Sequence, residues 1–355
     1  MYPQIEINTR KIEANTRAIA AAARRAGVSI AGVTKVTCGS PEVGRAMLNG
    51  GVAMLGESRL ENIARLRAAG LPGPYLLLRL PMLSQVERVV ALADYSLVSE
   101  LETIRALDRA AARAGKEHRV ILMVDLGDLR EGFWPDELVP AAVATAELRH
   151  VILAGIGVNL TCYGGVCPTP ANLGQLVALA REVEAATGRR LEIVSGGNSS
   201  SLRLLLQGQL PPGINHLRIG EGIVLGRETI AREPIPGAHL DAFIIRAEVI
   251  EVREKPSVPI GEIGQDAFGN VPVFEDVGRH LRAICAIGRQ DAPPEGLTPV
   301  DPAIRILGAS SDHLLLDVTK MASRPRIGDV IEFIPGYGAL LSAMTSPYVD
   351  KVWAR

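Results

Sequence analysis

From about residue 10 to residue 225, short apolar runs alternate with alanine-rich amphipathic segments, and this alternation allows few folds. The apolar runs are typical of strands buried in a parallel sheet, and the segments between them have helical periodicity. Strands are expected at residues 29–35, 53–55, 75–80, 95–98, 119–124, 151–158, 191–194 and 217–219, and helices at 10–26, 57–69, 100–114, 136–148 and 172–187. This pattern predicts an α/β fold built on a (β/α)8 TIM-like barrel. No G-x-G-x-x-G motif follows the first strand, which weighs against a dinucleotide-binding open sheet.

The pattern changes after residue 236, where alanine-rich helices give way to alternating apolar and polar runs. Strands are expected at residues 241–252, 281–287, 304–307, 313–318, 330–334 and 348–352. Turns between them contain glycine and proline, as is usual in an all-β domain. The opening segment 3–8 also has strand character and is expected to pair with this domain. The chain is therefore expected to form a barrel domain over residues 9–235 and a mostly-β C-terminal domain from residues 1–8 plus 236–355.

Composition argues against several classes of partner. The net charge is −1 and aromatic residues make up 4% of the chain, so binding to nucleic acid is not expected. No apolar run approaches about 18 residues, and the first residues lack a secretion signal, so no membrane association is expected. The four cysteines are scattered, which favours a reducing cytoplasmic compartment and no metal site.

Lys35 closes the first expected strand. Polar groups at the carboxyl ends of barrel strands face the region where such barrels do chemistry. A partly desolvated lysine loses proton affinity there and can form a Schiff base with a carbonyl compound. Alternatively, Lys35 only extends its ammonium group to the rim of a strand.

Two segments rich in small residues follow the seventh and eighth expected strands. Residues 195–201, with the sequence SGGNSSS, lead into a helix whose N-cap would be Asn198 or Ser199. Backbone N–H groups in such a segment can hold an anion, and the turn at Gly220 and Glu221 can supply more of them. Alternatively, this is only a glycine–serine turn before a capped helix.

Arg218 lies on the eighth expected strand and is expected to point into the barrel mouth; the alternative is a salt bridge to Glu221 or Glu192. Arg130 follows the fifth strand and could hold a carboxylate with both nitrogens, or could be a solvated loop charge. A strand-end lysine, a divided phosphate cradle and an arginine on the eighth strand together describe a pocket for pyridoxal 5'-phosphate.

Seven segments carry a family resemblance, namely residues 32–36, 56–62, 124–132, 195–201, 215–221, 256–262 and 339–347. On these segments the chain resembles the fold-type III pyridoxal-phosphate enzymes, and more narrowly the alanine/ornithine racemase branch. The resemblance implies an amino-acid racemase with an alanine-racemase-like barrel and a β domain. It also implies a head-to-tail homodimer with shared active sites, in which each β domain closes the partner's barrel mouth.

The resemblance implies a role for each matching residue. Lys35 matches the Schiff-base lysine, and Arg218 matches the arginine that faces the pyridine nitrogen. Arg130 matches the arginine that steadies the substrate carboxylate and the cofactor hydroxyl, and Asn159 is expected to line the substrate pocket. The other expected cofactor contacts are Asn198, Ser199, Ser200, Gly220, Glu221 and Tyr337.

The chain departs from alanine racemases of this family at several places. Met123 stands where they have a carbamylated lysine, Asn159 where they have a histidine, and Gly39 where they have a phosphate-binding tyrosine. They also have a tyrosine, the second catalytic base, near the start of the β domain. Here the segment 258–266 has none, and Glu262 is the first candidate for that base and Asp266 the second.

The two acids also bear on the choice of substrate. Either could pair with the distal ammonium of ornithine or another basic amino acid, or could simply cap a turn. Interconversion of L- and D-ornithine or a related basic amino acid is the expected reaction. Alanine or broad-specificity racemisation, a non-catalytic pyridoxal-phosphate carrier and an aldolase-type lyase are the alternatives. The β domain argues against the carrier, because such carriers resemble only the barrel half.

Overall fold

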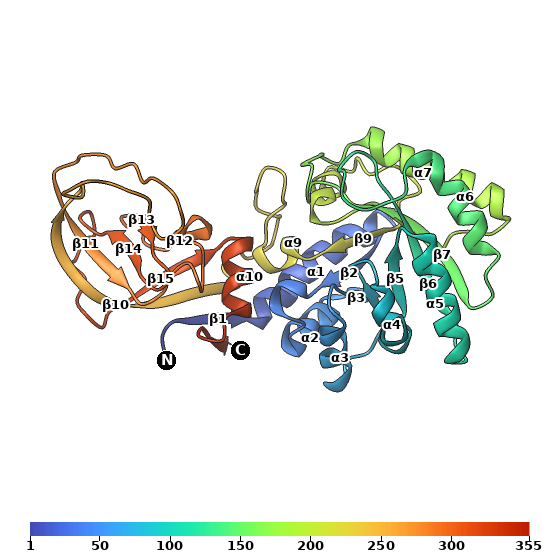
Figure 1. Ribbon diagram of the computed structural model, residues 1–355, viewed down its shortest axis with the longest axis horizontal. Helices are drawn as coiled ribbons and strands as arrows, with labels where there is room; N and C mark the ends of the chain where they lie inside the picture. Colours follow the sequence, from blue (N-terminus) through green and yellow to red (C-terminus); the bar gives the residue numbers. More distant parts are fainter. Residues whose placement is uncertain (355) are drawn as a thin grey trace. The chain divides into compact units, whose positions relative to one another are not determined.

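The structure is a computed structural model that describes residues 1–354. The chain divides into two compact units, one of Thr9–Leu240 and the other of Met1–Asn8 with Asp241–Arg355. Each unit has its own set of strands, shown in Figure 1.

The first unit is a closed barrel of eight parallel strands, as expected, ringed by helices (Figure 1). The strands are β2 (Ser29–Val33), β3 (Met54–Glu57), β4 (Tyr75–Leu77), β5 (Tyr95–Val98), β6 (His118–Val124), β7 (Val151–Val158), β8 (Ile193–Ser195) and β9 (His216–Ile219). Strand β9 pairs with β2, which closes the barrel and places the end of the last strand beside the end of the first.

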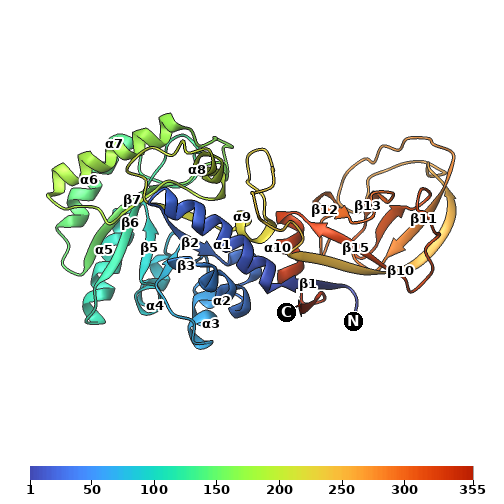
Figure 2. The same cartoon turned by 180° about the vertical axis from the view of Figure 1, so that it is seen from behind.

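Helices alternate with the barrel strands, one before the first strand and one after each strand, and the latter is the order that a (β/α)8 unit requires. They are α1 (Thr9–Arg25), α2 (Pro41–Gly50), α3 (Leu60–Ala68), α4 (Val86–Leu92), α5 (Leu101–Arg113), α6 (Pro135–Ala146), α7 (Pro170–Thr187), α8 (Leu202–Leu206) and α9 (Glu221–Leu225), with 3-10 turns η1 (Lys35–Thr37), η2 (Leu83–Gln85) and η3 (Ser199–Ser201). Helix α1 packs against α2 and β2, as Figure 2 shows from behind.

The barrel interior is filled by apolar side chains from several strands. One buried cluster contains Ala31, Met54, Leu76, Tyr95, Leu97, Ile121, Met123, Ala154 and Ile193. Met123 is therefore part of a packed core, and burial of an unpaired cation at this position would carry a large desolvation cost. Packing of this kind explains why the position suits methionine.

The second unit is a mostly antiparallel sheet. Its strands are β1 (Gln4–Asn8), β10 (Phe243–Pro256), β11 (Arg279–Cys285), β12 (Leu297–Pro299), β13 (Arg305–Ala309), β14 (Leu314–Asp317), β15 (Val330–Pro335) and β16 (Asp350–Ala354), with the 3-10 turn η4 (Pro294–Gly296) and helix α10 (Tyr337–Thr345). The expected pairing of the opening strand with this unit is confirmed, because β1 pairs with β10 and with β16.

Two local expectations were wrong. Lys35 begins η1 and is not part of β2, which ends at Val33. Glu57 is the last residue of β3 and not the first residue of a helix, because its carboxylate is bound inside the barrel wall. The mostly-β domain also contains a helix, α10, in which Ala339, Leu340, Ala343 and Met344 are buried.

Within residues 1–354, no helix combines the length and the apolar character that a membrane crossing requires.

Candidate active site

Lys35 lies at the carboxyl end of the barrel, in a tight turn directly after β2. The turn is closed by backbone hydrogen bonds from Thr37 and Gly39 to Thr34 O, at 3.0 and 3.2 Å. The Lys35 side chain is exposed, while the residues on both sides of it are buried. The turn therefore fixes the backbone of Lys35 and leaves its amine accessible.

Glu57 is a buried carboxylate next to this turn that the sequence analysis did not identify as a site residue. Its Oε1 accepts a hydrogen bond from Thr34 Oγ1 at 2.6 Å, and its Oε2 accepts from Asn62 Nδ2 at 3.0 Å. The backbone N–H of Ser58 adds a third bond at 3.1 Å. Burial raises the pKa of Glu57, while these bonds and the charge of Lys35 act in the opposite direction. Glu57 thus joins β3, α3 and the turn that carries Lys35.

Gly39 shows why the phosphate-binding tyrosine of alanine racemases has no counterpart here. Its φ is +60°, in the left-handed region that favours glycine. A Cβ at this position would lie 2.6 Å from Asn62 Cβ. Asn62 therefore occupies the space beside residue 39 and uses its amide to bind Glu57.

Arg218 is a buried cation that bonds only to neutral groups. It is 4% exposed. Its Nη1 donates to Ser195 Oγ at 2.5 Å, and its Nη2 donates to Val158 O at 2.8 Å. Burial lowers the pKa of the guanidinium to about 10, so the group keeps its charge at neutral pH. The alternative of a salt bridge from Arg218 to Glu221 or Glu192 is wrong, since Glu221 pairs with Arg232 and Glu192 with Arg119.

The loops after β8 and β9 carry the small polar residues that the sequence pointed to, and the Ser199 side chain joins the two loops. Asn198 is the N-cap of η3, and its Oδ1 accepts from Ser200 N at 2.8 Å. Ser199 Oγ accepts from Gly220 N at 3.3 Å and from Gly222 N at 3.1 Å. We refer to residues 198–200 and 220–222 as the cradle.

The cradle lies beside the end of β2. A Cβ on Gly220 would lie 3.1 Å from Val33 Cβ, so the backbone there passes close to the strand that leads to Lys35. Burial raises the pKa of Glu221, and the charges of Arg232 and Lys35 oppose that effect. Lys35 and the cradle therefore belong to one region of the barrel mouth.

Two buried polar atoms in this region have no hydrogen-bond partner among the described residues: Asn159 Nδ2 and Ser200 Oγ. The Asn159 Oδ1 accepts from Asn198 Nδ2 at 3.0 Å, which brings Asn159 against the cradle. Buried polar groups are almost always satisfied, so these two donors point to a ligand with acceptor atoms. A phosphate or a phenolic oxygen supplies such acceptors.

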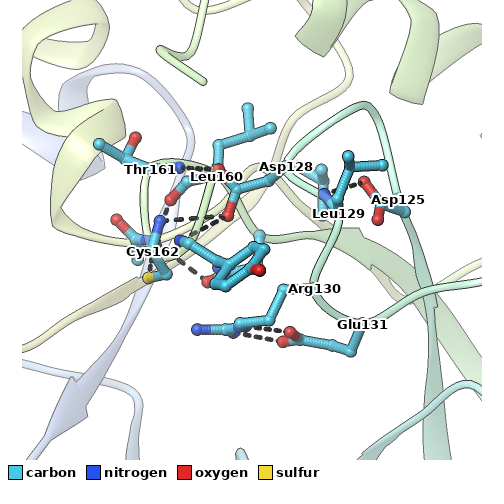
Figure 3. A network of polar contacts seen from close by, with 12 residues as sticks. Asp125, Asp128, Leu129, Arg130, Glu131, Leu160, Thr161 and Cys162 are labelled. Atoms are coloured by element: carbon cyan, nitrogen blue, oxygen red, sulfur yellow. Dashed lines mark hydrogen bonds and ion pairs between the residues drawn. The ribbon is translucent and has the colours of Figure 1, made fainter. Parts of the chain in front are cut away.

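Arg130 lies in the loop after β6, where its guanidinium forms two hydrogen bonds with the carboxylate of its neighbour Glu131 (Figure 3). This pairing raises the pKa of Arg130. The charges of Arg130 and Glu131 also act on Arg218, so the three side chains share one end of the barrel. Arg130 is exposed and its ion pair is with its sequence neighbour, so this pairing does not decide between its two expected roles, a carboxylate-binding residue and a solvated loop charge.

Three expected site residues, Glu262, Asp266 and Tyr337, lie in the β unit. Glu262 lies in the exposed segment 257–278 between β10 and β11. Asp266 caps a turn there, since its Oδ1 accepts from Phe268 N and Asn270 N, each at 2.9 Å. These bonds lower the pKa of Asp266. Tyr337 is the first residue of α10.

Among residues 1–354, no three or more His, Cys, Asp or Glu side chains are grouped so that they could hold a metal ion.

Comparison with known proteins places this chain in a family. The model of the alanine racemase N-terminal domain matches residues 7–228. The chain is 44% identical to a lysine racemase of Thermotoga maritima over 353 residues and 45% identical to an ornithine racemase of Acetoanaerobium sticklandii over 352 residues, covering 99% of both chains in each pair. Among solved structures, an alanine racemase of Streptomyces lavendulae matches 99% of this chain and 97% of its own, with a TM-score of 0.77 and 21% identity. A D-threonine aldolase of Filomicrobium marinum has a TM-score of 0.74 at 18% identity and covers 97% of this chain and 89% of its own, so the fold alone does not set the reaction. The chain belongs to the alanine racemase family.

Proposed function

We propose that this protein is a pyridoxal-phosphate-dependent racemase that interconverts the L- and D-forms of ornithine or lysine. The observation that carries the proposal is the full-length similarity to a lysine racemase and an ornithine racemase, each matched over 99% of both chains. The match includes the β unit, which a carrier protein built from the barrel half alone would lack. Racemisation of alanine is the less favoured alternative, because the sequence similarity to an alanine racemase of Desulfosudis oleivorans covers only 62% of this chain, at 27% identity.

The residues of the barrel mouth fit the cofactor. Lys35 offers an accessible amine for its aldehyde, and the Ser200 hydroxyl of the cradle and the adjoining Asn159 amide offer donors for its phosphate. Arg218 supplies a permanent positive charge that no acidic side chain neutralises by direct pairing. When bound, pyridoxal phosphate supplies an electron sink for the negative charge that develops at the substrate Cα.

Arg218 favours racemisation over transamination in this proposal. A fixed cation that faces the pyridine nitrogen disfavours protonation of that nitrogen and so weakens the electron sink. A proton is then returned to Cα quickly. Ser195 and the Val158 carbonyl hold the guanidinium in place for this role.

We assign the two faces of the substrate Cα to two different bases. The Lys35 amine serves one face. Glu262 of a partner subunit is the proposed base for the opposite face, since its side chain is exposed and forms no hydrogen bond or ion pair within residues 1–354. Asp266 is the weaker candidate, because it already caps a turn.

A head-to-tail homodimer is part of the proposal. The segment 257–278 exposes several large apolar side chains, among them Ile260, Val271 and Val273. Leu129, Trp134 and Tyr163 are exposed in the barrel unit, and the first and third of these lie in the loops after β6 and β7. Exposed apolar residues of this number are typical of surfaces that a partner covers. A reducing, cytoplasmic setting is the expected location.

One experiment tests the reaction and names the substrate. The purified protein, supplied with pyridoxal phosphate, is incubated with each L-amino acid in D2O. Deuterium at Cα together with both enantiomers of lysine or ornithine supports the proposal. Exchange without the D-enantiomer, or no exchange with any basic amino acid, contradicts it.

A second experiment tests the cofactor separately. Borohydride reduction in the presence of pyridoxal phosphate is expected to leave a stable adduct on Lys35, read by peptide mass spectrometry. The Lys35→Ala variant controls for reaction at other lysines. An adduct distributed over surface lysines, equal in both proteins, overturns the assignment of Lys35.

A further inference from the structure

Asp128 is a buried carboxylate in the loop after β6 that has no assigned role. It is 1% exposed, although the loop around it is at the surface. Its two oxygens accept hydrogen bonds from four backbone N–H groups of another loop, the one after β7, which we call the β7 loop (residues 159–169). Figure 3 shows the carboxylate of Asp128 facing Thr161 and Cys162.

The bonds to Asp128 cover much of the β7 loop. Oδ1 accepts from Thr161 N at 2.9 Å and from Val166 N at 3.2 Å. Oδ2 accepts from Cys162 N at 3.2 Å and from Tyr163 N at 3.1 Å. The backbone carbonyl of Asp128 accepts a fifth bond from Gly164 N at 3.0 Å. A single residue therefore satisfies most of the backbone donors of residues 161–166.

The β7 loop in turn holds the cradle. Asn198 Nδ2 donates to Leu160 O at 2.9 Å and to Asn159 Oδ1 at 3.0 Å. The other end of the same amide, Oδ1, accepts from Ser200 N. Contacts thus run without a break from the Asp128 loop through the β7 loop to Asn198 and the cradle.

The β7 loop depends on these contacts because it has little regular structure of its own. Thr161 has φ +71°, an unfavourable conformation for a residue with a branched Cβ. A carboxylate is an acceptor only, and hydrogen bonds from N–H groups to a charged acceptor are stronger than bonds between neutral groups. Removal of the carboxylate leaves four loop amides without their acceptors and releases the strained conformation.

We propose that Asp128 is a positioning residue for the cofactor phosphate: it fixes the β7 loop, and through Asn198 the loop fixes the cradle. The proposal rests on the proposed function, because it takes the cradle as the phosphate site. Asp128 itself does not touch the cofactor. Its effect is therefore expected to appear only with a ligand that carries the phosphate.

Asp125 provides a matched control within the same loop. It is also a buried aspartate, and its Oδ1 accepts from Gly127 N at 2.8 Å and from Leu129 N at 3.2 Å. Both donors belong to its own loop, so Asp125 has no bond to the β7 loop. Both variants, Asp128→Ala and Asp125→Ala, thus remove a buried carboxylate, but only Asp128→Ala removes hydrogen bonds to the β7 loop.

The test compares two aldehydes on the full-length protein after removal of bound cofactor. Lys35 is trapped with borohydride at rising concentrations of pyridoxal phosphate or of pyridoxal, which lacks the phosphate. Asp128→Ala is expected to raise the half-saturating concentration of pyridoxal phosphate about tenfold or more, from the loss of charged hydrogen bonds, and to leave that of pyridoxal unchanged. Asp125→Ala is expected to leave the ratio of the two concentrations at its wild-type value.

Each other outcome has a definite meaning. If the wild-type protein traps no pyridoxal phosphate at Lys35, the proposed function fails. If the wild-type protein does trap it, two results make only the role of Asp128 fail. Either Asp128→Ala keeps the wild-type ratio of the two half-saturating concentrations, or Asp125→Ala changes that ratio as much as Asp128→Ala does. The double variant Asp128→Ala/Asn198→Ala is expected to bind pyridoxal phosphate no more weakly than Asn198→Ala alone. Losses of affinity that add up from the two substitutions overturn the path through Asn198.

Hydrogen exchange on the wild-type protein keeps the proposal falsifiable if the alanine variant does not fold. The amides of residues 161, 162, 163 and 166 are expected to exchange slowly in spite of their surface loop, because Asp128 binds them. Exchange at the rate of an unstructured peptide overturns the proposal. Asp128→Asn, which keeps one acceptor oxygen, is expected to speed exchange mainly at two of the four amides.

Discussion

The Arg218 guanidinium donates to the Ser195 hydroxyl at 2.5 Å, inside the barrel and without direct pairing to a carboxylate. The same hydroxyl lies 2.9 Å from His216 Nδ1. Burial and the charge of Arg218 lower the pKa of His216 to about 3, so the imidazole is neutral and adds no positive charge beside the arginine. Arg218 therefore depends on neutral partners for its position.

Ser195→Ala is expected to lower the free energy of unfolding by about 1–3 kcal/mol, since a buried charged donor loses its acceptor. Ser201→Ala is the matched control. Ser201 is also buried, and its hydroxyl donates to a neutral partner, Gly196 O, at 2.6 Å. Its loss is expected to cost only about 0.5–1.5 kcal/mol. Urea unfolding measures both, and equal losses would contradict the charged role of the Arg218 contact.

The sequence was sufficient to predict the barrel, the β domain and the place of Lys35 because these depend on local patterns. Apolar runs mark the strands, and the residue after each run lies at the barrel mouth. The helix α2 was also predictable, since Ser40 is its N-cap, Pro41 its first residue and Gly51 follows its end, although the sequence analysis did not include it.

The partners of the site residues could not be predicted in the same way. Glu57 looks like an ordinary helix-starting acid in the sequence, and only the closed barrel brings Thr34 and Asn62 to its two oxygens. Asp128 likewise looks like a polar loop residue. Its four donors lie between 33 and 38 residues away in the chain, and no local pattern links them.

Stability at mildly acid pH is expected to depend on two buried histidines. Burial lowers the pKa of His118 to about 4, and the pKa of His216 is about 3, against 6.5 for each in the unfolded chain. The unfolded chain therefore binds more protons than the folded protein between about pH 6.5 and pH 4, and stability falls as the pH falls through that window. Each histidine is expected to account for about 2 kcal/mol of loss between pH 7 and pH 5.

Two substitutions test this dependence. His118→Gln replaces the ring nitrogen that contacts Ser96, and His216→Asn replaces the one that contacts Ser195. Each variant is expected to lose about 2 kcal/mol less than wild type over the same pH range, measured by urea unfolding. A pH dependence identical to wild type would show that the histidine is protonated in the folded protein.

Glu57 is expected to produce the opposite pH dependence. Because burial raises its folded-state pKa, its contribution to stability is fully present below the unfolded value and is lost as the pH rises through the folded value. Glu57→Gln keeps the shape and one acceptor oxygen but carries no charge. The free energy of unfolding of wild type relative to Glu57→Gln is therefore expected to decrease from pH 4 to pH 8. A difference that stays constant over this range would show that hydrogen bonds fully offset the burial of the carboxylate.

Gly39 and Asn62 are expected to form a coupled pair. Gly39→Ala places a Cβ 2.6 Å from Asn62 Cβ and requires a left-handed conformation of alanine, so it is expected to destabilise by about 1–3 kcal/mol. Asn62→Gly in the same chain removes the contact with the Cβ and leaves the Cα of residue 62 at 3.0 Å, and it does not remove the backbone strain. The double variant should therefore cost less than the sum of the two single changes. Additive losses of unfolding free energy would mean that the two residues do not clash sterically.

Gly155→Ala is expected to be among the most disruptive small substitutions in the barrel, because β7 and β8 approach closely at this residue. An added Cβ would overlap Ile193 O and lie 2.8 Å from its carbonyl carbon, and a paired backbone carbonyl cannot move aside without breaking the sheet. A loss of about 3 kcal/mol or more is expected, with a parallel loss of cofactor binding, since β7 leads to Asn159 and β8 to the cradle.

Gly174→Ala is the control: Gly174 lies in α7 with no atom within 4 Å of the new Cβ, so a gain of about 0.5–1 kcal/mol is expected. Thermal unfolding with and without pyridoxal phosphate separates the two effects, and a Gly155→Ala protein with wild-type stability would mean that β7 and β8 are farther apart than the structure places them.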